Sequence, residues 1–393
     1  MFDVPAGWNQ TCLGDLADIL CSNVDKKSRP APEIAIKLCN YRDVYHNDMI
    51  TFDIAFMSAT ATNVEVNRFS IRCGDVVITK DSESPADIAV PAYVSDIFSD
   101  VVCGYHLAII RSVSAQVSGA YLHQLFGLQA VRAYYYLYAN GITRFGLTKP
   151  MMHAMPVIYP SRAEQQRIVN ILQAIDHLIE LYRAQCKKLN NLKKGLLQTI
   201  LQQDLPGLEA SNTLPMGWCI RRLGETVTLV YGKTCRKPMA AYGQYPVLGA
   251  NGVIGYTDDY LFDGVSIILG RKGTINKPYY TKGPCWVIDT AFYLQDFQNV
   301  CPRWLYYVLV ALDLSFYNEA TGVPSLSRET LYGITYKHPP LEEQQQMANT
   351  LLAVDQHIIA CEARLNHYRK LKEALRQDLL TGKVRTQPSN VER

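Results

Sequence analysis

The sequence lacks several features that would identify whole classes of protein. No apolar run approaches the roughly 18 residues that a membrane-spanning helix needs, and no basic segment followed by an apolar one stands at Met1. The 11 cysteines include no Cys-x-x-Cys pair and no matched spacing, which predicts neither a zinc site nor a disulfide framework. We therefore expect a cytoplasmic protein with reduced, mostly buried thiols.

The sequence also lacks a strong charge of either sign. Its formal net charge is +3 over 393 residues, which excludes a uniformly basic protein. Basic residues nevertheless outnumber acidic ones between positions 221 and 282, whereas residues 1–150 are slightly acidic. Any contact with a polyanion is therefore expected to be a local patch.

Enzyme motifs are missing as well. Gly232-Lys233-Thr234 resembles the end of a phosphate-binding loop, but Val227 replaces the required upstream glycine. Residues 249–255 carry three glycines at the wrong spacing for a dinucleotide site, and residues 338–341 lack the leading amide of an adenine methyltransferase motif. The sequence therefore predicts no catalytic centre, no metal site and no cofactor bound by this chain.

The most prominent feature is a helix-forming stretch that occurs twice. The copies begin near Pro160 and Pro339 and are related by a constant offset of 179 positions. Seven residues are identical between them: Glu164, Gln165, Gln166, Asn170, Leu172, Ala174 and Asp176 recur as Glu343, Gln344, Gln345, Asn349, Leu351, Ala353 and Asp355. Apolar residues follow a heptad spacing in both copies, which predicts long helices over 160–204 and 340–383. Neither helix can bury its apolar seam alone, so each is the obvious partner of the other.

The duplication extends to the rest of the chain. Pro5-Ala6-Gly7-Trp8 recurs as Pro215-Met216-Gly217-Trp218, which makes the whole chain a tandem repeat. The globular regions 1–150 and 211–338 are each predicted to be α+β, with strands first and a helix last. The predicted strands are 64–72, 74–79, 105–110, 265–269 and 285–294, and the predicted helices are 121–137 and 304–314.

These residues resemble the specificity subunit of a type I restriction-modification system. The resemblance rests on the two helix starts, on the ending Leu375-Arg376-Gln377-Asp378-Leu379-Leu380-Thr381-Gly382-Lys383-Val384-Arg385, and on residues 270–277 followed by 289–292. The first domain lacks the pattern of residues 270–277, because its corresponding loop, residues 79–84, has the sequence Thr-Lys-Asp-Ser-Glu-Ser.

The resemblance implies two target-recognition domains joined by an antiparallel coiled coil with a pseudo-twofold axis. Such a chain would be a non-catalytic subunit that reads two half-sites on double-stranded DNA, with the helix pair setting their separation. It also implies docking of two methyltransferase subunits, which use S-adenosylmethionine to modify adenine. Further restriction subunits would use ATP and Mg²⁺ for translocation and cleavage.

The strongest candidate DNA contact follows the predicted strand 265–269, where two glycines let the backbone approach closely and cations can meet phosphates or guanine. Its residues are Arg271, Lys272, Thr274, Asn276, Lys277, Tyr279 and Tyr280, and a solvated hairpin is the alternative. Further candidates, with ordinary surface as the alternative, are Lys233, Arg236 and Lys237 in the second domain and Lys26, Lys27, Arg29, Lys80 and Arg144 in the first.

The repeated Glu-Gln-Gln triplets have two interpretations. Helix-start capping accounts for the glutamates, and the glutamines are candidates for contact with the opposite domain or a partner subunit. Two rival functions stay open: a structural adaptor whose domains bind proteins, and a single-chain methyltransferase or nuclease, which the missing motifs disfavour.

Overall fold

The chain folds into two units, and each one combines a globular domain with parts of two long helices. The structure, a computed structural model, describes residues 4–201, 214–235 and 240–386. The first unit contains the residues up to Leu181 and those from Leu365 onward, and the second runs from Tyr182 to Arg364. Among the described residues, no helix is long and apolar enough to cross a membrane.

Both domains begin with the same turn and the same strand pair. In the first, Trp8 N donates to Pro5 O at 3.0 Å across Gly7, whose positive φ of 78° suits a glycine. Strand β1 (Asn9–Cys12) then pairs antiparallel with β12 (Pro156–Tyr159). The second domain repeats this with a turn before Trp218 and with β13 (Cys219–Arg222) against β21 (Thr335–His338). In each domain the entering chain is therefore fixed to the strand that leads into the long helix.

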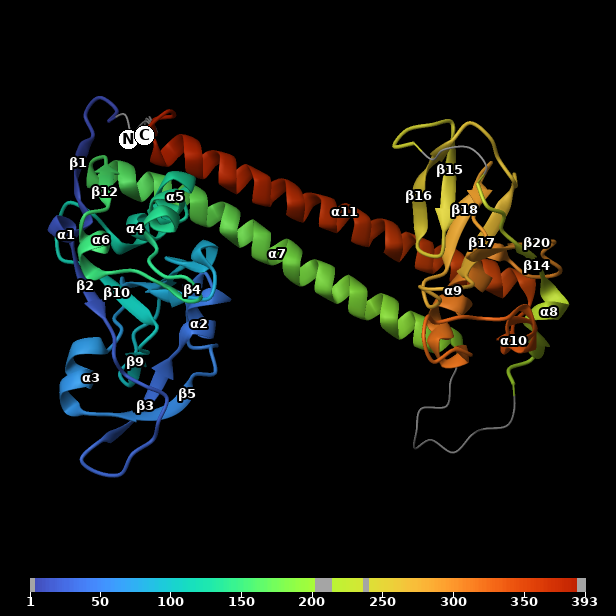
Figure 1. Cartoon of the computed structure of the whole chain (residues 1–393), viewed down its shortest axis with the longest axis horizontal. Coiled ribbons are helices and arrows are strands. Elements are labelled where there is room, and N and C mark those ends of the chain that lie inside the picture. The colour runs from blue at the N-terminus through green and yellow to red at the C-terminus, as the bar shows by residue number, and fades with distance from the viewer. Residues whose placement is uncertain (1–3, 202–213, 236–239, 387–393) are drawn as a thin grey trace, which may run out of the picture. The chain divides into compact units, whose positions relative to one another are not determined.

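The first domain contains two main sheets (Figure 1). The five-stranded sheet has the order β2 (Ala17–Cys21), β10 (Leu107–Ser112), β6 (Val76–Thr79), β8 (Pro91–Val94) and β4 (Met49–Ile50). The three-stranded sheet has the order β5 (Met57–Ala61), β3 (Ile34–Cys39) and β9 (Val101–Cys103), and β7 (Asp81–Ser82) pairs with β11 (Phe145–Gly146). The helices are α1 (Leu13–Leu16), α2 (Tyr41–Tyr45), α3 (Asn63–Phe69), η1 (Pro85–Asp87), α4 (Gly119–Phe126), α5 (Gln129–Tyr138) and α6 (Lys149–His153).

The second domain is a shorter version of this arrangement. Its larger sheet has the order β14 (Thr228–Tyr231), β20 (Ala291–Gln295), β17 (Val265–Gly270) and β18 (Tyr279–Lys282). The smaller one has the order β16 (Gly252–Thr257), β15 (Tyr245–Gly249) and β19 (Trp286–Val287). The helices are α8 (Leu223–Thr226), α9 (Pro302–Ala311), η2 (Leu314–Tyr317) and α10 (Arg328–Gly333). The predicted α+β class is confirmed.

Each domain core is completed by both long helices, α7 (Arg162–Leu201) and α11 (Leu341–Leu380). In the first unit Leu172 of α7 and Leu380 of α11 are buried in one cluster with Tyr121 of α4. In the second unit Leu351 of α11 is buried with Trp304 of α9, and Leu196 of α7 packs against them. The seam of each helix therefore contributes to a domain core as well as to the other helix.

The helices are antiparallel within each unit, and the same ion pair occurs in both. In the first unit Asp176 of α7 meets Lys372 of α11. In the second, Lys193 Nζ of α7 lies 2.7 Å from Asp355 Oδ1 of α11. The offset of 179 converts Asp176 into Asp355 and Lys193 into Lys372, so each helix supplies one member of each pair.

Several local predictions were wrong. Residues 63–69 form a helix rather than a strand, because Thr62 and Glu65 make a capping box. The predicted helix 121–137 is two helices that are interrupted near Gly127, where the Arg376 guanidinium occupies the space that a side chain would need. The predicted strand 285–294 is split between β19 and β20.

The thiols only partly follow the prediction. Five of the cysteines are buried, but Cys12 and Cys73 are exposed. Within the described ranges no three metal-binding side chains gather into a cluster.

Candidate nucleic-acid interface

Arg271 lies on a tightly held loop directly after β17. Its backbone N donates to Thr290 O at 2.9 Å, and its carbonyl accepts from Leu326 N at 3.0 Å. Its Nη1 donates to the backbone carbonyl of Asp289 at 3.2 Å. The preceding Gly270 leaves no room for a side chain, because an added Cβ would lie 2.0 Å from Thr274 O. The loop thus presents Arg271 in a defined direction.

Arg328, which the sequence analysis missed, lies beside Arg271. The guanidinium of Arg328 is 4.6 Å from the ring centre of Tyr231, and that of Arg271 is 5.2 Å from the same ring. Such contacts hold a planar cation in place while its donors stay available. Neither arginine forms an ion pair with a carboxylate among the residues that the structure describes. This cluster of Arg271, Arg328 and Tyr231 is called the arginine corner below.

The first domain builds the corresponding place from lysines. Lys80 follows β6; its N donates to His106 O at 2.8 Å and its carbonyl accepts from Leu147 N at 3.0 Å, which matches the backbone contacts of Arg271. Lys149 begins α6 as Arg328 begins α10. Leu147 N bonds to Lys80 O, and Lys149 follows two residues later, so the backbone brings the two lysines to the same part of the domain. Lys80 and Lys149 are called the lysine corner.

The other predicted cations of the first domain divide into two groups. The pKa of His106 is lowered, chiefly by burial and also by the charges of Arg144 and Lys26. The Asp81 carboxylate, 3.3 Å from His106 Nδ1, opposes this shift. The charges of Arg144 and Lys26 therefore act on His106, whose backbone carbonyl accepts from Lys80 N. Arg29 instead pairs with Asp25 at 2.5 Å and Glu33 at 3.2 Å, which neutralises it locally, and Lys27 is exposed on the same loop.

The remaining candidates of the second domain are spread over several faces. Lys272, Asn276 and Lys277 are exposed and Thr274 is half-buried. Tyr280 packs beneath Arg303, whose guanidinium is 3.5 Å from its ring centre, so this ring serves packing against α9. Tyr279, its neighbour on β18, is exposed and lies against Gly252. Arg236 and Lys237 lie outside the described residues.

Lys233 borders the same region as Arg271. Its carbonyl accepts from Trp286 Nε1 at 2.8 Å, and its N donates to Val287 O at 2.9 Å. A hollow of about 750 Å³ is lined by Lys233, Trp286 and Asp289, the residue whose carbonyl holds Arg271. Lys233 therefore lines this hollow, and Arg271 is linked to it only through its hydrogen bond to Asp289.

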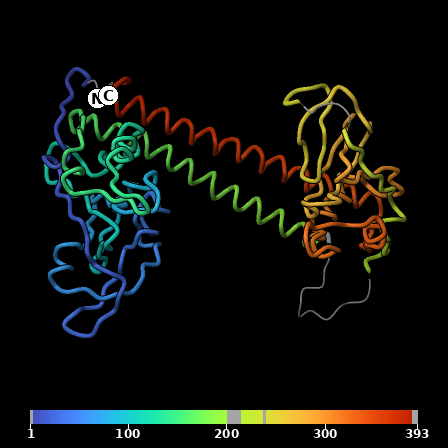
Figure 2. The backbone as a smooth tube through the Cα atoms, in the orientation of Figure 1, coloured from blue at the N-terminus to red at the C-terminus, as the bar shows by residue number. Residues whose placement is uncertain are grey.

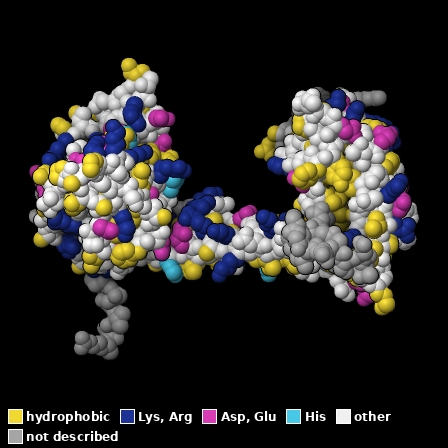
Figure 3. Space-filling view, turned by 90° about the horizontal axis from the view of Figure 1, so that it is seen from below, with side chains coloured by type: hydrophobic (Ala, Val, Ile, Leu, Met, Phe, Trp, Pro, Cys, Tyr) yellow, Lys and Arg dark blue, Asp and Glu magenta, His cyan; other side chains and the backbone are white. Residues whose placement is uncertain are grey.

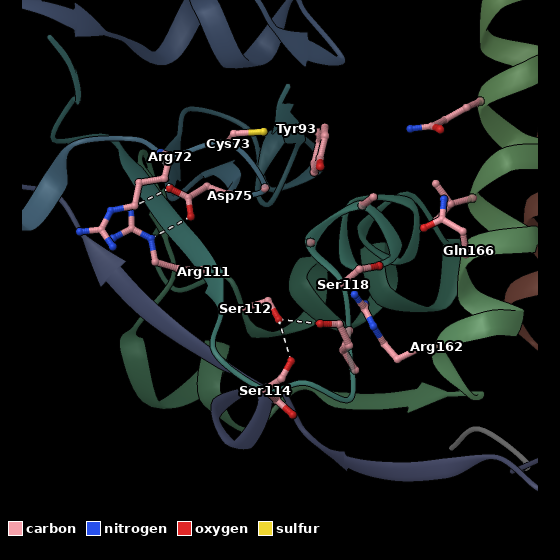
Figure 4. A pocket seen from close by; sticks show the side chains of 16 residues that line it. Arg72, Cys73, Asp75, Tyr93, Arg111, Ser112, Ser114, Ser118, Arg162 and Gln166 are labelled. Carbon is pink, nitrogen blue, oxygen red and sulfur yellow. Dashed lines mark hydrogen bonds and ion pairs between the residues drawn. The ribbon is translucent and has the colours of Figure 1, made fainter. Parts of the chain in front are cut away.

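A second hollow, of about 550 Å³, lies in the first unit between β10, α4 and α7 (Figure 4). Arg72, Arg111 and Arg162 line it, and Arg111 is paired: its Nε and Nη2 lie 2.8 and 2.7 Å from the oxygens of buried Asp75. In Figure 3 positive, negative and hydrophobic side chains are interspersed over the first domain. These observations favour local contacts over one continuous basic belt.

The repeated Glu-Gln pairs bind their own domains. Gln165 is buried; its Nε2 donates to Gln116 O at 2.6 Å and its Oε1 accepts from Ser118 N at 3.1 Å. Gln344 is equally buried, with its Oε1 accepting from Cys301 N at 2.8 Å. The expected contact with the opposite domain or a partner is therefore wrong for these two glutamines, each of which joins a long helix to the domain before it.

The two glutamates lie in the first turns of α7 and α11, as predicted, and each also contacts a residue far away in the sequence. Glu164 accepts from Arg385 Nε and Nη2 at 2.8 and 2.9 Å, and this contact lowers the pKa of Glu164. Glu343 accepts from Trp218 Nε1 at 2.9 Å. Arg385 also donates to Ala6 O, which places the end of the described chain beside its beginning in the first unit (Figure 2).

The comparison with protein families decides the identity of the chain. The family described as "Type I restriction modification DNA specificity domain" matches residues 5–191 and 215–367. The chain belongs to this family. As a type I specificity subunit it is non-catalytic, and catalysis lies in other subunits of the system.

Individual proteins and structures show the same similarity. The chain is 22% identical to the type I restriction enzyme MjaVIII specificity subunit of Methanocaldococcus jannaschii, over 98% of this chain and 95% of the relative. It is 26% identical to the EcoprrI specificity subunit of Escherichia coli over 108 residues, 27% of each chain. The crystal structure of the S subunit from M. genitalium matches with a TM-score of 0.65 and 13% identity, covering 96% of both chains.

Proposed function

We propose that this specificity subunit recognises a split target in double-stranded DNA, with each domain reading one half. The observation that carries the proposal is the corner that occurs twice. In one domain Leu147 bonds to Lys80 and leads to Lys149 two residues later, and in the other Leu326 bonds to Arg271 and leads to Arg328. Arg271 and Arg328 also flank the ring of Tyr231. Cations held on rigid loops bind phosphates or base edges, and a duplicated pair of them suits two half-sites.

The proposal gives the helix pair the role of a spacer. Because the ion pairs Asp176–Lys372 and Lys193–Asp355 fix the register of α7 and α11 within each unit, the length of the helices would set the distance between half-sites. Removing one helical turn from both helices should change the spacer and leave both half-sites as they were.

Docking of partner subunits belongs to the same proposal. Apolar side chains that the two units leave exposed on the helices, among them Leu181, Leu192 and Ile359, suit contacts with two methyltransferase subunits. Those subunits would supply S-adenosylmethionine and the adenine chemistry, and restriction subunits would supply the ATP- and Mg²⁺-dependent steps. Such a complex would work on DNA in the cytoplasm.

Mapping methylated adenines in cells that carry this chain and its methyltransferase subunit tests the proposal. A split motif that disappears when the chain is deleted is the expected result. A motif that survives the deletion would overturn it. Steep loss of DNA affinity with added salt distinguishes DNA reading from a protein adaptor, because phosphate contacts release counterions.

A further inference from the structure

Each domain has a short loop that exposes an apolar side chain beside its cation corner. The loop of the first domain, residues 140–146, carries Ile142, which is 94% exposed. The corresponding loop of the second domain, residues 319–325, carries Val323, which is 66% exposed. Exposed apolar side chains are common singly, but here one occurs in the same loop of both copies.

Both loops are closed at the base by hydrogen bonds. In the first, Asn140 N donates to Gly146 O at 3.0 Å and Gly146 N donates back at 2.9 Å. In the second, the Asn318 side-chain oxygen accepts from Ala320 N at 3.2 Å and from Ser325 N at 3.0 Å. In both closed loops the apolar side chain lies outside the domain core. Such a tip is held out toward solvent or a partner.

The cations of each corner lie at the base of these loops, where the chain leaves the loop. The chain leaves the first loop through Leu147, which bonds to Lys80, and reaches Lys149 two residues later. It leaves the second through Leu326, which bonds to Arg271, and reaches Arg328 two residues later. In addition, Gly273 N donates to Pro324 O at 2.8 Å, which ties the Arg271 loop to the residue after Val323.

We propose that these two loops read base edges, and that Val323 contacts the methyl group of a thymine while the arginine corner holds the neighbouring backbone. The inference rests on the proposed function and adds the residues that discriminate bases. Thymine is the only base with a methyl group in the major groove, and apolar side chains recognise it by contact. At the offset of 179, Arg144 occupies the position of Val323, and Ile142 precedes it by two residues. The first domain therefore presents a different tip and reads a different half-site.

The test combines a protein variant with a base analogue. In the complex with its methyltransferase subunits, binding is measured on the mapped target with each thymine of the second half-site replaced in turn by deoxyuridine, which lacks the methyl group. One such position should weaken wild-type binding about fourfold, the value of one buried methyl group. In V323A the same replacement should have no effect, because the contact is already lost. V253A, which shortens an exposed valine on β16, is the matched control and should respond as wild type.

The outcomes separate this inference from the proposed function. Equal deoxyuridine effects in V323A and wild type, no effect in either, or a second half-site without thymine would each overturn it. I142A should alter discrimination in the other half-site only. If the wild-type complex has no split target at all, the proposed function itself fails before the loops are tested.

Discussion

The two domains share their buried contacts and differ in the side chains that face outward. Gln165 and Gln344 make the same kind of backbone contacts, and Lys80 and Arg271 occupy the same backbone position. Within the part of the chain that the structure describes, neither arginine of the arginine corner forms an ion pair with a carboxylate, whereas Lys80 Nζ lies 3.5 Å from Asp81 Oδ2 in the lysine corner. Duplication has therefore kept the interactions that hold each domain on its helix, and the surface residues that would read DNA have diverged.

The largest expected difference between the domains is their response to acid. Burial lowers the pKa of His123 in α4 to about 4, and Lys372 and Arg376 add to this effect while Asp48 opposes it. Ser118 N and Cys301 N both bond to the repeated glutamine, so His123, five residues after Ser118, corresponds to Tyr306 of α9. The unfolded chain binds a proton near pH 6.5 and the folded one only near pH 4, so stability should fall as the pH drops through this window, by about 3 kcal/mol.

Hydrogen exchange of α4 and α9 between pH 7 and 4 measures this effect. Protection of α4 should fall relative to α9, and H123F should abolish the difference. An equal loss in both helices would contradict a role for His123.

The second prediction concerns the buried glutamines and is the same for both domains. Q165L and Q344L each leave buried backbone groups without partners, which should cost about 2 kcal/mol in the free energy of unfolding. Q166L and Q345L, at exposed neighbouring positions, are the matched controls and should change little. Urea unfolding followed by domain-specific probes measures both, and tolerance of Q344L alone would break the equivalence of the two domains.

The third prediction compares the contributions of the arginine corner and the lysine corner to DNA binding. R271A and R328A should each weaken DNA binding roughly five- to tenfold and lower the salt dependence by about one counterion. K80A should have a smaller effect, because Asp81 already pairs with Lys80. Binding titrations at several salt concentrations measure this, with K282A at the exposed end of β18 as a control. A larger effect of K80A than of R271A would reverse the assignment.

The smallest effect concerns the helix ion pairs. K372M removes the partner of half-buried Asp176, whereas after K193M the Asp355 carboxylate still accepts from Tyr307 Oη at 2.8 Å. We expect losses of stability of about 1 kcal/mol, larger for K372M. Thermal unfolding of both variants provides the comparison, and a greater loss for K193M would argue against the role of Tyr307.

The sequence was sufficient for the long helices because their signals are local: heptad spacing throughout and Gly382, with a φ of 69°, just after Leu380. At α3 the β-branched residues Val64 and Val66 led to a wrong prediction of a strand. The capping box of Thr62 favours the helix that is observed. The members of the arginine corner, Tyr231, Arg271 and Arg328, lie far apart in the sequence. No local sequence pattern connects them. The offset of 179 aligns Leu326-Ser327-Arg328 with Leu147-Thr148-Lys149, and this signal would have drawn attention to Arg328.

The most direct test of the account is to replace residues 211–338 with the second domain of a related specificity subunit and to map methylated adenines again. The account predicts a new split motif in which one half and the spacer length are unchanged and the other half is that of the donor. A motif changed in both halves, or in neither, would contradict the claim that each domain reads its own half of the target.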